Sequence, residues 1–292
     1  RDMHKSWGNA IWFDDAAEKM GVDVMRWMYS LQNIEQNLLF GYGPADEVRK
    51  KLITLWNVYS FYATYAAVDG FSPSNHPIEL NELNILDRWV IAKTHVLIKD
   101  GRKSMEQFRV DMFMKSFEIF LEELSNWYVR RNRRRFWKSE DDHDKNSAYA
   151  TLYHVLTNLI KSIAPVLPFV SETIYQNLVI NSEPKSPESV HLCDYPKSNE
   201  KWIDMELIKN VDSLKRFVEL GRSARSKSKI KIRQPLEKVS YAIEDNGVAE
   251  FFMENKEIIL DELNVKEVER LTGSDQLIAY KIKPNLRTLG QK

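Results

Sequence analysis

Residues 107–137 read QFRVDMFMKSFEIFLEELSNWYVRRNRRRFW. Apolar side chains recur there at intervals of three and four, the spacing of one helix face: Phe113, Phe117, Phe120, Leu121 and Leu124. At about 100° per residue, Arg131 and Arg135 continue this stripe. The remaining arginines point to adjoining faces: Arg130, Arg133 and Arg134. Because an apolar face turns into an arginine face, we expect a long helix whose carboxyl end leaves the core.

Helical patterns flank this stretch on both sides. The apolar residues of 45–68 recur at three and four, and Asp69-Gly70-Phe71-Ser72-Pro73 ends that pattern. Further helices are predicted over 14–20, 22–31, 81–102, 144–164 and 169–179. Ten glycines and ten prolines in 292 residues supply few turns, which disfavours an all-β sandwich. Consecutive helices with short connections predict a mainly α fold built on a helical bundle.

The chain changes character after residue 182. Residues 183–200 are rich in proline and serine, a composition typical of a linker. Beyond them, we expect helical residues at 203–227 and 247–263, and strands at 230–233, 236–243, 265–271 and 277–282. This pattern predicts a small α+β domain. The predicted parts are therefore an opening region at 1–43, a bundle at 44–182, a linker at 183–200 and the α+β domain at 201–292.

Composition excludes several classes of function. The 42 lysine and arginine residues balance 42 acidic residues, so any basic surface has to be local. The single cysteine, Cys193, excludes an internal disulfide and a thiolate zinc cluster, and fits a reducing cytoplasm. No two of the six histidines lie three or four residues apart, so we expect no metal site. No apolar run approaches about 20 residues, so we expect a cytoplasmic protein without membrane contact.

The basic run at 130–135, with Lys138 beyond it, is the strongest local signal for a ligand. Guanidinium groups interleaved with aromatic rings such as Trp127 suit phosphate contact and base stacking, so RNA is a candidate ligand. The alternative is that these arginines offset the helix dipole and pair with acidic residues just downstream: Glu140, Asp141, Asp142 and Asp144. Spacing alone leaves both interpretations open.

A second basic set lies at residues 222–233, where Arg222 and Arg225 come first. Further on, cations alternate with isoleucines in the order Lys229, Ile230, Lys231, Ile232 and Arg233. This alternation predicts a strand with its charges on one face and its isoleucines on the other. Such a basic ribbon either contacts nucleic acid or protects a sheet edge by charge.

The opening residues place a lysine, a serine and a glycine in a short loop ahead of a helix, which suits a polyphosphate. Together with several stretches further along the chain, this loop makes the sequence similar to class I aminoacyl-tRNA synthetases, and most of all to their isoleucyl branch. The stretches that carry the resemblance are DMHKSWGN at 2–9, GVDVMRW at 21–27, LSNWYVRRNRRRFW at 124–137, APVLPFVSE at 164–172, SVHL at 189–192, GR at 221–222 and KIRQPL at 231–236.

The resemblance implies a bundle that docks the anticodon stem and loop of tRNA. It also implies that residues 1–43 end the catalytic region of a longer isoleucine–tRNA ligase, which uses ATP with magnesium in a Rossmann domain. No His-x-Gly-His motif occurs in this chain, so we expect the chain alone to be inactive and to bind no cofactor. We also expect it to be monomeric. The implied tRNA-binding residues are Trp127, Arg130, Arg131, Arg133, Arg134, Arg135, Lys138, Arg222, Arg225, Lys229, Lys231 and Arg233.

Lys5, with His4 and Ser6, matches the catalytic Lys-Met-Ser-Lys-Ser loop of the family, whose second lysine stabilises charge on the pyrophosphate. Asp2 stands where a lysine is usual and His4 where a serine is usual, so we hypothesise that the whole protein acts through Lys5. Two alternatives stay open. The first is a synthetase-derived scaffold that assembles proteins without binding tRNA. The second is the equivalent region of a valyl or leucyl relative.

Overall fold

The computed structural model describes residues 5–8, 10–33, 35–138 and 142–271. The chain divides into two compact units after Met205, and each unit is described by itself. Residues 1–43, predicted as a separate part, belong to the first unit together with the bundle.

The first unit is the predicted helical bundle, and each predicted helix is present. Its α-helices are α1 Phe13–Met20, α2 Val22–Ser30, α3 Tyr42–Asp69, α4 Ile85–Glu106, α5 Val110–Glu123, α6 Arg130–Lys138, α7 Asp142–Ile163 and α8 Pro168–Tyr175. Two π-helical segments, η4 Leu124–Val129 and η5 Gln176–Ile180, continue α5 and α8. The short 3₁₀ turns are η1 Lys5–Trp7, η2 Pro73–Asn75, η3 Leu80–Glu82, η6 Val190–Leu192 and η7 Glu200–Trp202.

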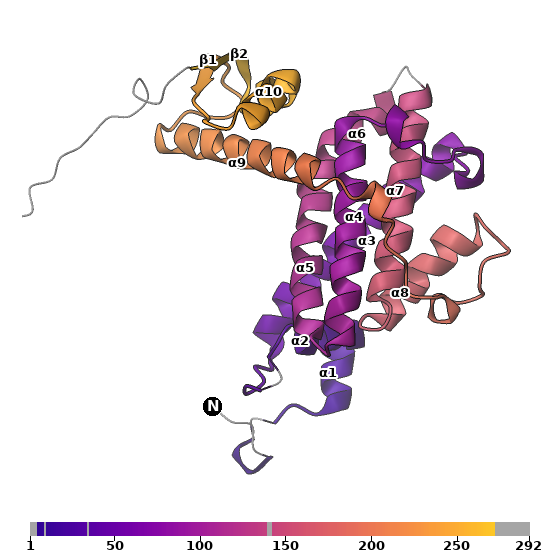
Figure 1. The fold of residues 1–292 in the computed structure, drawn as a ribbon. Helices are drawn as coiled ribbons and strands as arrows, with labels where there is room; N and C mark the ends of the chain where they lie inside the picture. Colours follow the sequence, from indigo (N-terminus) through magenta and orange to yellow (C-terminus); the bar gives the residue numbers. More distant parts are fainter. Residues whose placement is uncertain (1–4, 9, 34, 139–141, 272–292) are drawn as a thin grey trace, which may run out of the picture. The chain divides into compact units, whose positions relative to one another are not determined.

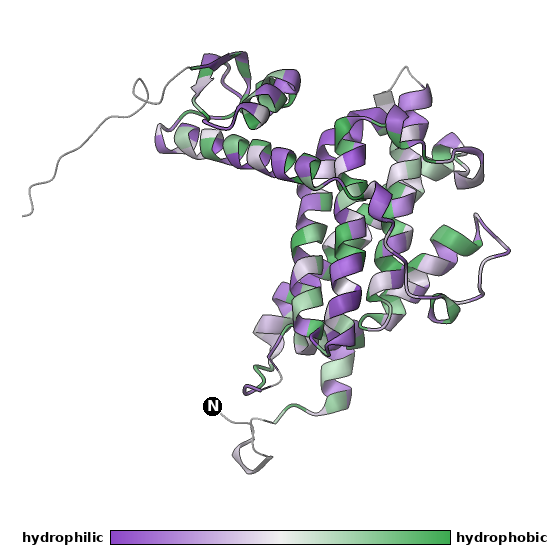
Figure 2. Ribbon diagram, viewed as in Figure 1, coloured by the Kyte–Doolittle hydropathy of each residue, from purple (hydrophilic) through white to green (hydrophobic). Residues whose placement is uncertain are grey.

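The long helices α3, α4, α5 and α7 lie side by side and enclose the core (Figure 1). Hydrophobic and hydrophilic residues alternate along each of them with the helical turn, as Figure 2 shows. The apolar stripe predicted on α5 is buried throughout. Large aromatic side chains fill the space around it, among them Trp27, Trp89, Tyr128 and Tyr149.

Two side chains of α2 hold the turn between α7 and α8. The Asp23 carboxylate accepts hydrogen bonds from the backbone N–H groups of Val170 at 2.7 Å and Phe169 at 3.4 Å, which are free donors in the first turn of α8. Arg26 donates to the carbonyl oxygens of Val166 at 2.7 Å and Pro165 at 2.9 Å. The stretches 21–27 and 164–172, both of which carry the family resemblance, are therefore in direct contact.

The linker predicted at residues 183–200 is not a linker, because it packs on the first unit. The Glu172 carboxylate of α8 accepts hydrogen bonds from the Ser189 hydroxyl and the Val190 N–H, each at 2.9 Å. Tyr175 donates its hydroxyl to the carbonyl of Pro187 at 2.8 Å. Its proline and serine content is typical of a linker, but the bundle helices supply partners for its polar groups.

The end of this segment packs on the buried His95 and the half-buried His154. The Nε2 atoms of His95 on α4 and His154 on α7 are 3.2 Å apart, and the Asn199 N–H donates to His95 Nδ1 at 3.2 Å. The Trp202 ring lies 5.1 Å from the His95 ring and 4.9 Å from the His154 ring. Burial lowers the pKa of His95 to about 4, and burial together with His95 lowers the pKa of His154 to about 3. Both rings are therefore neutral at pH 7.

The second unit is the predicted small α+β domain. It consists of α9 Met205–Lys227, β1 Leu236–Tyr241, α10 Asn246–Glu254, α11 Lys256–Leu263 and β2 Val265–Arg270. The two strands pair in parallel, with Leu236 opposite Val265. A Cβ on Gly221 would lie 2.7 Å from the Leu263 side chain, so glycine permits α9 and α11 to pack closely there. The strand predicted at 277–282 lies outside the described residues.

No helix in the described ranges combines the length and the apolar character needed to cross a membrane.

His95 and His154 make the stability of the first unit sensitive to acid. Their pKa values are lower in the folded state than the usual 6.5, so the folded state resists protonation. The stabilisation is complete above pH 6.5 and falls as the pH drops toward 4, by about 1.4 kcal/mol per pH unit for each histidine. Urea unfolding between pH 7 and pH 5 should show this slope, and His154→Gln should reduce it. The exposed His191 gives the control variant His191→Gln, and equal slopes in all three proteins would contradict the prediction.

Candidate nucleic-acid interface

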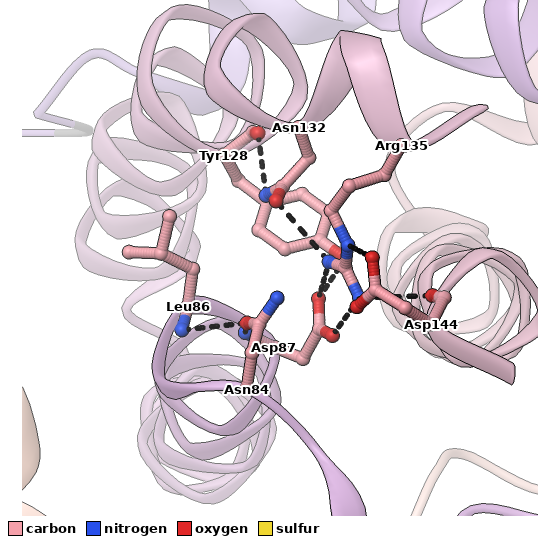
Figure 3. Close-up of polar contacts among 7 residues, drawn as sticks. All are labelled: Asn84, Leu86, Asp87, Tyr128, Asn132, Arg135 and Asp144. Carbon is pink, nitrogen blue, oxygen red and sulfur yellow. Dashed lines mark hydrogen bonds and ion pairs between the residues drawn. The ribbon is translucent and has the colours of Figure 1, made fainter. Parts of the chain in front are cut away.

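A buried arginine near the carboxyl end of α6 ties three helices together (Figure 3). Arg135 donates to both carboxylate oxygens of Asp87 on α4, at 2.9 and 2.8 Å. It also donates to both carboxylate oxygens of Asp144 on α7, at 2.9 and 2.6 Å. Tyr128 donates its hydroxyl to Asp87 at 2.6 Å, and Asn132 accepts from Arg135 at 3.1 Å. A planar guanidinium with five N–H donors suits this arrangement.

Two carboxylates stabilise the positive charge of Arg135. Asp87 is fully buried, and the Arg135 side chain is only 13% exposed. Burial alone would lower the pKa of Arg135, but the hydrogen bonds and charges of Asp87 and Asp144 raise it above its usual value. Asp87 and Asp144 also lie in the first turns of α4 and α7, where a helix dipole stabilises negative charge.

The expectation that the basic helix leaves the core at its arginines is wrong for Arg135. The stripe does continue from α5 through η4 into α6, but two carboxylates from other helices give the arginine a place inside the bundle. Arg135 is therefore not available to a phosphate. The alternative interpretation, pairing with an acidic residue downstream, is correct for Arg135 and Asp144.

The expectation that Trp127 stacks on RNA is also contradicted. Its side chain is only 6% exposed. The guanidinium carbons of Arg130 and Arg131 lie 6.0 and 5.9 Å from its ring centre, so these arginines cover the ring. The prediction rested on its place beside the arginine run, but Trp127 lies in η4 and not in α6, and its side chain is buried there.

The opposite face of α6 is exposed. We call it the α6 face, and it consists of Arg130, Arg133, Arg134 and Trp137, which follow one another at intervals of three, one and three. Arg133 lies 5.9 Å from the ring centre of Phe61 on α3, and the Trp137 ring lies 6.1 Å from the Tyr65 ring. Trp137 is one of the aromatic residues interleaved with the arginine run in the sequence, but only Trp127 was included among the predicted tRNA-binding residues. Of Lys138 the structure describes the backbone only.

The second basic set begins in α9 with Arg222 and Arg225 and continues into a loop, so the predicted strand at 230–233 is wrong. Arg225 is buried and donates to the carbonyl oxygens of Lys231 at 2.8 Å and of Gln234. Because a side chain takes up these carbonyls, they form no strand ladder, and Ile232 is 46% exposed where the prediction placed it inside. Arg225 is therefore an internal support of the loop and is unavailable to RNA.

The other cations of this set differ in their surroundings. Arg222 forms an ion pair with the buried Glu262 of α11. We define the basic loop as residues 228–235, and its cations are exposed: Lys229, Lys231 and Arg233. Lys229 has a φ of 58°, so the chain turns in the left-handed region at the start of this loop.

The opening loop is only partly described. Asp2 and His4 lie outside the described residues, and of Lys5 only the backbone is described, at the start of η1. Ser6 is exposed. The assignment of Lys5, His4 and Ser6 to the catalytic loop therefore rests on the sequence.

Residues 87–240 match the anticodon-binding domain of tRNA ligase. The chain belongs to this family. The match begins at Asp87, the carboxylate that holds Arg135, and it ends within β1. The predicted resemblance to the synthetases is thereby confirmed.

Curated relatives agree with the isoleucyl branch. The chain is 40% identical over 291 residues to the isoleucine–tRNA ligase of Clostridium novyi (strain NT) and 41% identical over 294 residues to that of Clostridium tetani (strain Massachusetts / E88). It covers 28% of each of these proteins, while 99% of the chain itself is matched. The isoleucine–tRNA ligase of Dehalococcoides mccartyi is 42% identical over 266 residues, which are 90% of this chain and 26% of that protein. These relatives fit the main interpretation and not the scaffold alternative.

A solved structure shares the fold. It is the ternary complex of Agrobacterium radiobacter K84 agnB2 LeuRS with tRNA and LeuAMS, with a TM-score of 0.52 and 15% sequence identity. The similarity covers 70% of this chain and 23% of that one. The mainly α fold of the synthetase class is therefore confirmed.

Removal of Arg135 should destabilise the first unit. Arg135→Met keeps much of the side-chain volume but leaves the Asp87 carboxylate buried without its cation, which typically costs about 3–5 kcal/mol. The exposed Arg134 gives the matched variant Arg134→Met, which we expect to stay within about 0.5 kcal/mol of the parent. Chemical denaturation measures both. A loss below about 1 kcal/mol for Arg135→Met would show that the network is not needed for stability.

Proposed function

We propose that this chain binds tRNA and that the α6 face contacts the anticodon stem and loop. The observation that carries the proposal is the exposure of three arginines and an indole on one side of a helix in an anticodon-binding domain. No acidic residue occurs in the sequence between Glu123 and Glu140, so the local charge is strongly positive although the chain is neutral as a whole. Arginine forks match phosphate oxygens in geometry as well as charge.

The internal network supports this function indirectly. Because Arg135 fixes the rotation of α6, the α6 face is held outward before any ligand arrives. A prearranged set of cations loses less side-chain and backbone freedom on binding than a mobile set. The buried ion pair and the exposed arginines therefore have separate tasks, although both lie within a run of six residues.

We assign the basic loop of the second unit to the same ligand class. Three cations of the loop are exposed: Lys229, Lys231 and Arg233. Arg225 holds the loop backbone by donating to the carbonyl oxygen of Lys231. The nearest acidic residues in the sequence are Glu219 and Glu237, outside the basic set. A loop of this charge suits the phosphate backbone rather than a particular base.

The chain spans about 28% of the length of the isoleucine–tRNA ligases that it matches. For the whole protein we propose ATP-dependent attachment of isoleucine to tRNA in the cytoplasm, with the catalytic chemistry in a Rossmann domain outside this chain. The sequence contains no His-x-Gly-His motif, the partner of the lysine loop at the ATP site of this family. We derive no step through ATP from this chain, and we propose that it is inactive by itself.

Loss of two arginines from the α6 face should weaken tRNA binding and flatten its salt dependence. Arg133→Ala with Arg134→Ala removes up to two phosphate contacts, so fewer counterions are released on binding. The slope of log K against log salt should become shallower by about 1–2. Filter binding of an isoleucine tRNA across a salt series measures this slope.

The control for this experiment is a double variant with the same change in charge. Lys99→Ala with Arg109→Ala removes two cations of the first unit that already pair with Glu200 and Asp111. We expect nearly unchanged binding curves for it. If the α6 variant gave the same curves as this control, the α6 face would not be the tRNA contact.

In the whole protein, Lys5→Ala should slow adenylate formation. The family resemblance gives Lys5 the task of stabilising charge on pyrophosphate, and loss of one such interaction typically costs about 10²–10³ in rate. ATP–pyrophosphate exchange with isoleucine measures it, with Lys50→Ala, on α3, as a control. An unchanged exchange rate would refute the role of Lys5.

A further inference from the structure

We propose that Trp137 is the base-stacking residue of the α6 face. It receives one unpaired base of an RNA loop while Arg133 and Arg134 hold phosphates of the same strand. This inference rests on the proposed function and adds to it the form of RNA that the face prefers. A single-stranded loop should bind better than a fully paired helix.

The exposure of Trp137 sets it apart from its neighbours. Trp127, Tyr128 and Phe136 are at most 6% exposed, whereas Trp137 is 50% exposed. A half-exposed indole beside arginines offers an aromatic surface and positive charge together. Proteins that bind single-stranded nucleic acid combine these two features.

Contacts within the bundle hold the indole in place. The Trp137 ring meets the Tyr65 ring of α3 at an angle of 69° with 6.1 Å between the ring centres. Because the rings meet edge to face and are not stacked, Tyr65 braces the indole and still leaves half of it exposed. A braced ring loses little rotamer freedom when a base stacks on it.

Other aromatic residues near the face are less suitable. Phe61 is half-buried and already has the Arg133 guanidinium over its ring at 5.9 Å. Trp56 is 41% exposed, but it lies more than two turns before Tyr65 on α3 and contacts the Tyr59 ring instead. Trp137 follows Arg133 and Arg134 by about one helical turn, which is about 4.5–6 Å along the axis, so the three side chains can contact one short stretch of RNA.

Base stacking explains why Trp137 should prefer an unpaired RNA loop to a paired helix. In a paired RNA helix, bases are covered by their neighbours, so an indole finds no open base face except at the ends. In a loop, unstacked bases pack on aromatic side chains. The arginines contact phosphates in both forms and do not distinguish between them. Trp137 is therefore the residue that should make the α6 face favour a loop.

The test compares two RNAs with the intact chain. One is a hairpin with the sequence of the anticodon stem and loop of an isoleucine tRNA, and the other is a fully paired duplex of the same stem. We expect the parent chain to bind the hairpin more tightly. Trp137→Leu should weaken hairpin binding about 10-fold and leave duplex binding unchanged, since one base stack accounts for a loss of this order.

Two further variants complete the design. Trp137→Phe keeps an aromatic ring and should restore most of the hairpin affinity, which a loss of folding would not. Trp56→Leu removes another exposed indole of the first unit and should leave both affinities unchanged.

The proposal is overturned if Trp137→Leu binds the hairpin as tightly as the parent does, or if it weakens the hairpin and the duplex equally. If either result occurs while Arg133→Ala with Arg134→Ala still weakens binding, the α6 face remains the RNA contact and only the stacking assignment is lost. If the arginine variant also binds normally, the proposed function itself fails.

Discussion

A carboxylate with no access to solvent requires a cation, and in this protein Asp87 finds it in Arg135. Asp87 lies in the first turn of α4, whose amino end is capped by Asn84, and the cap holds the backbone of Asp87 in place. Arg135 then joins that turn to the first turn of α7 through Asp144. One ion pair thus sets the rotation of α6, and the rotation decides that Arg130, Arg133, Arg134 and Trp137 face outward.

Three of the stretches by which the chain resembles its family contact one another: 21–27, 164–172 and 189–192. Asp23 and Arg26 of α2 bind the turn at 165–170, and Glu172 of α8 binds residues 189–190. Arg225 organises the basic loop in the second unit as Arg135 organises α6 in the first, although it uses backbone carbonyls instead of carboxylates. The two basic sets, which suggest a ligand in the sequence, therefore each contain one internal arginine that supports the fold, Arg135 in the first and Arg225 in the second.

The sequence predicted the helices of the bundle and the strands at 236–241 and 265–270, because periodicity records which face of an element is buried. It did not predict the partner of Arg135, since Asp87 is 48 residues away and no local pattern links them. The alternation at 230–233 looked like a strand, yet Arg225 takes the carbonyls that a strand would need. Trp127 and Trp137 both adjoin the arginine run, and only tertiary packing decides that Trp127 is buried and Trp137 exposed.

A chain without net charge can bind a polyanion if its acidic and basic residues are placed in different surroundings. Two acidic side chains surround Arg135 inside the bundle, while Arg133 and Arg134 are exposed on the α6 face. Positive charge at this end of the bundle thus arises from where arginines are placed and not from an excess of them. A field that is local falls off within about 10 Å at ordinary ionic strength. Such a surface attracts and orients a polyanion only at close range. Selectivity for a loop over a paired helix therefore has to come from direct contacts, through shape and base stacking.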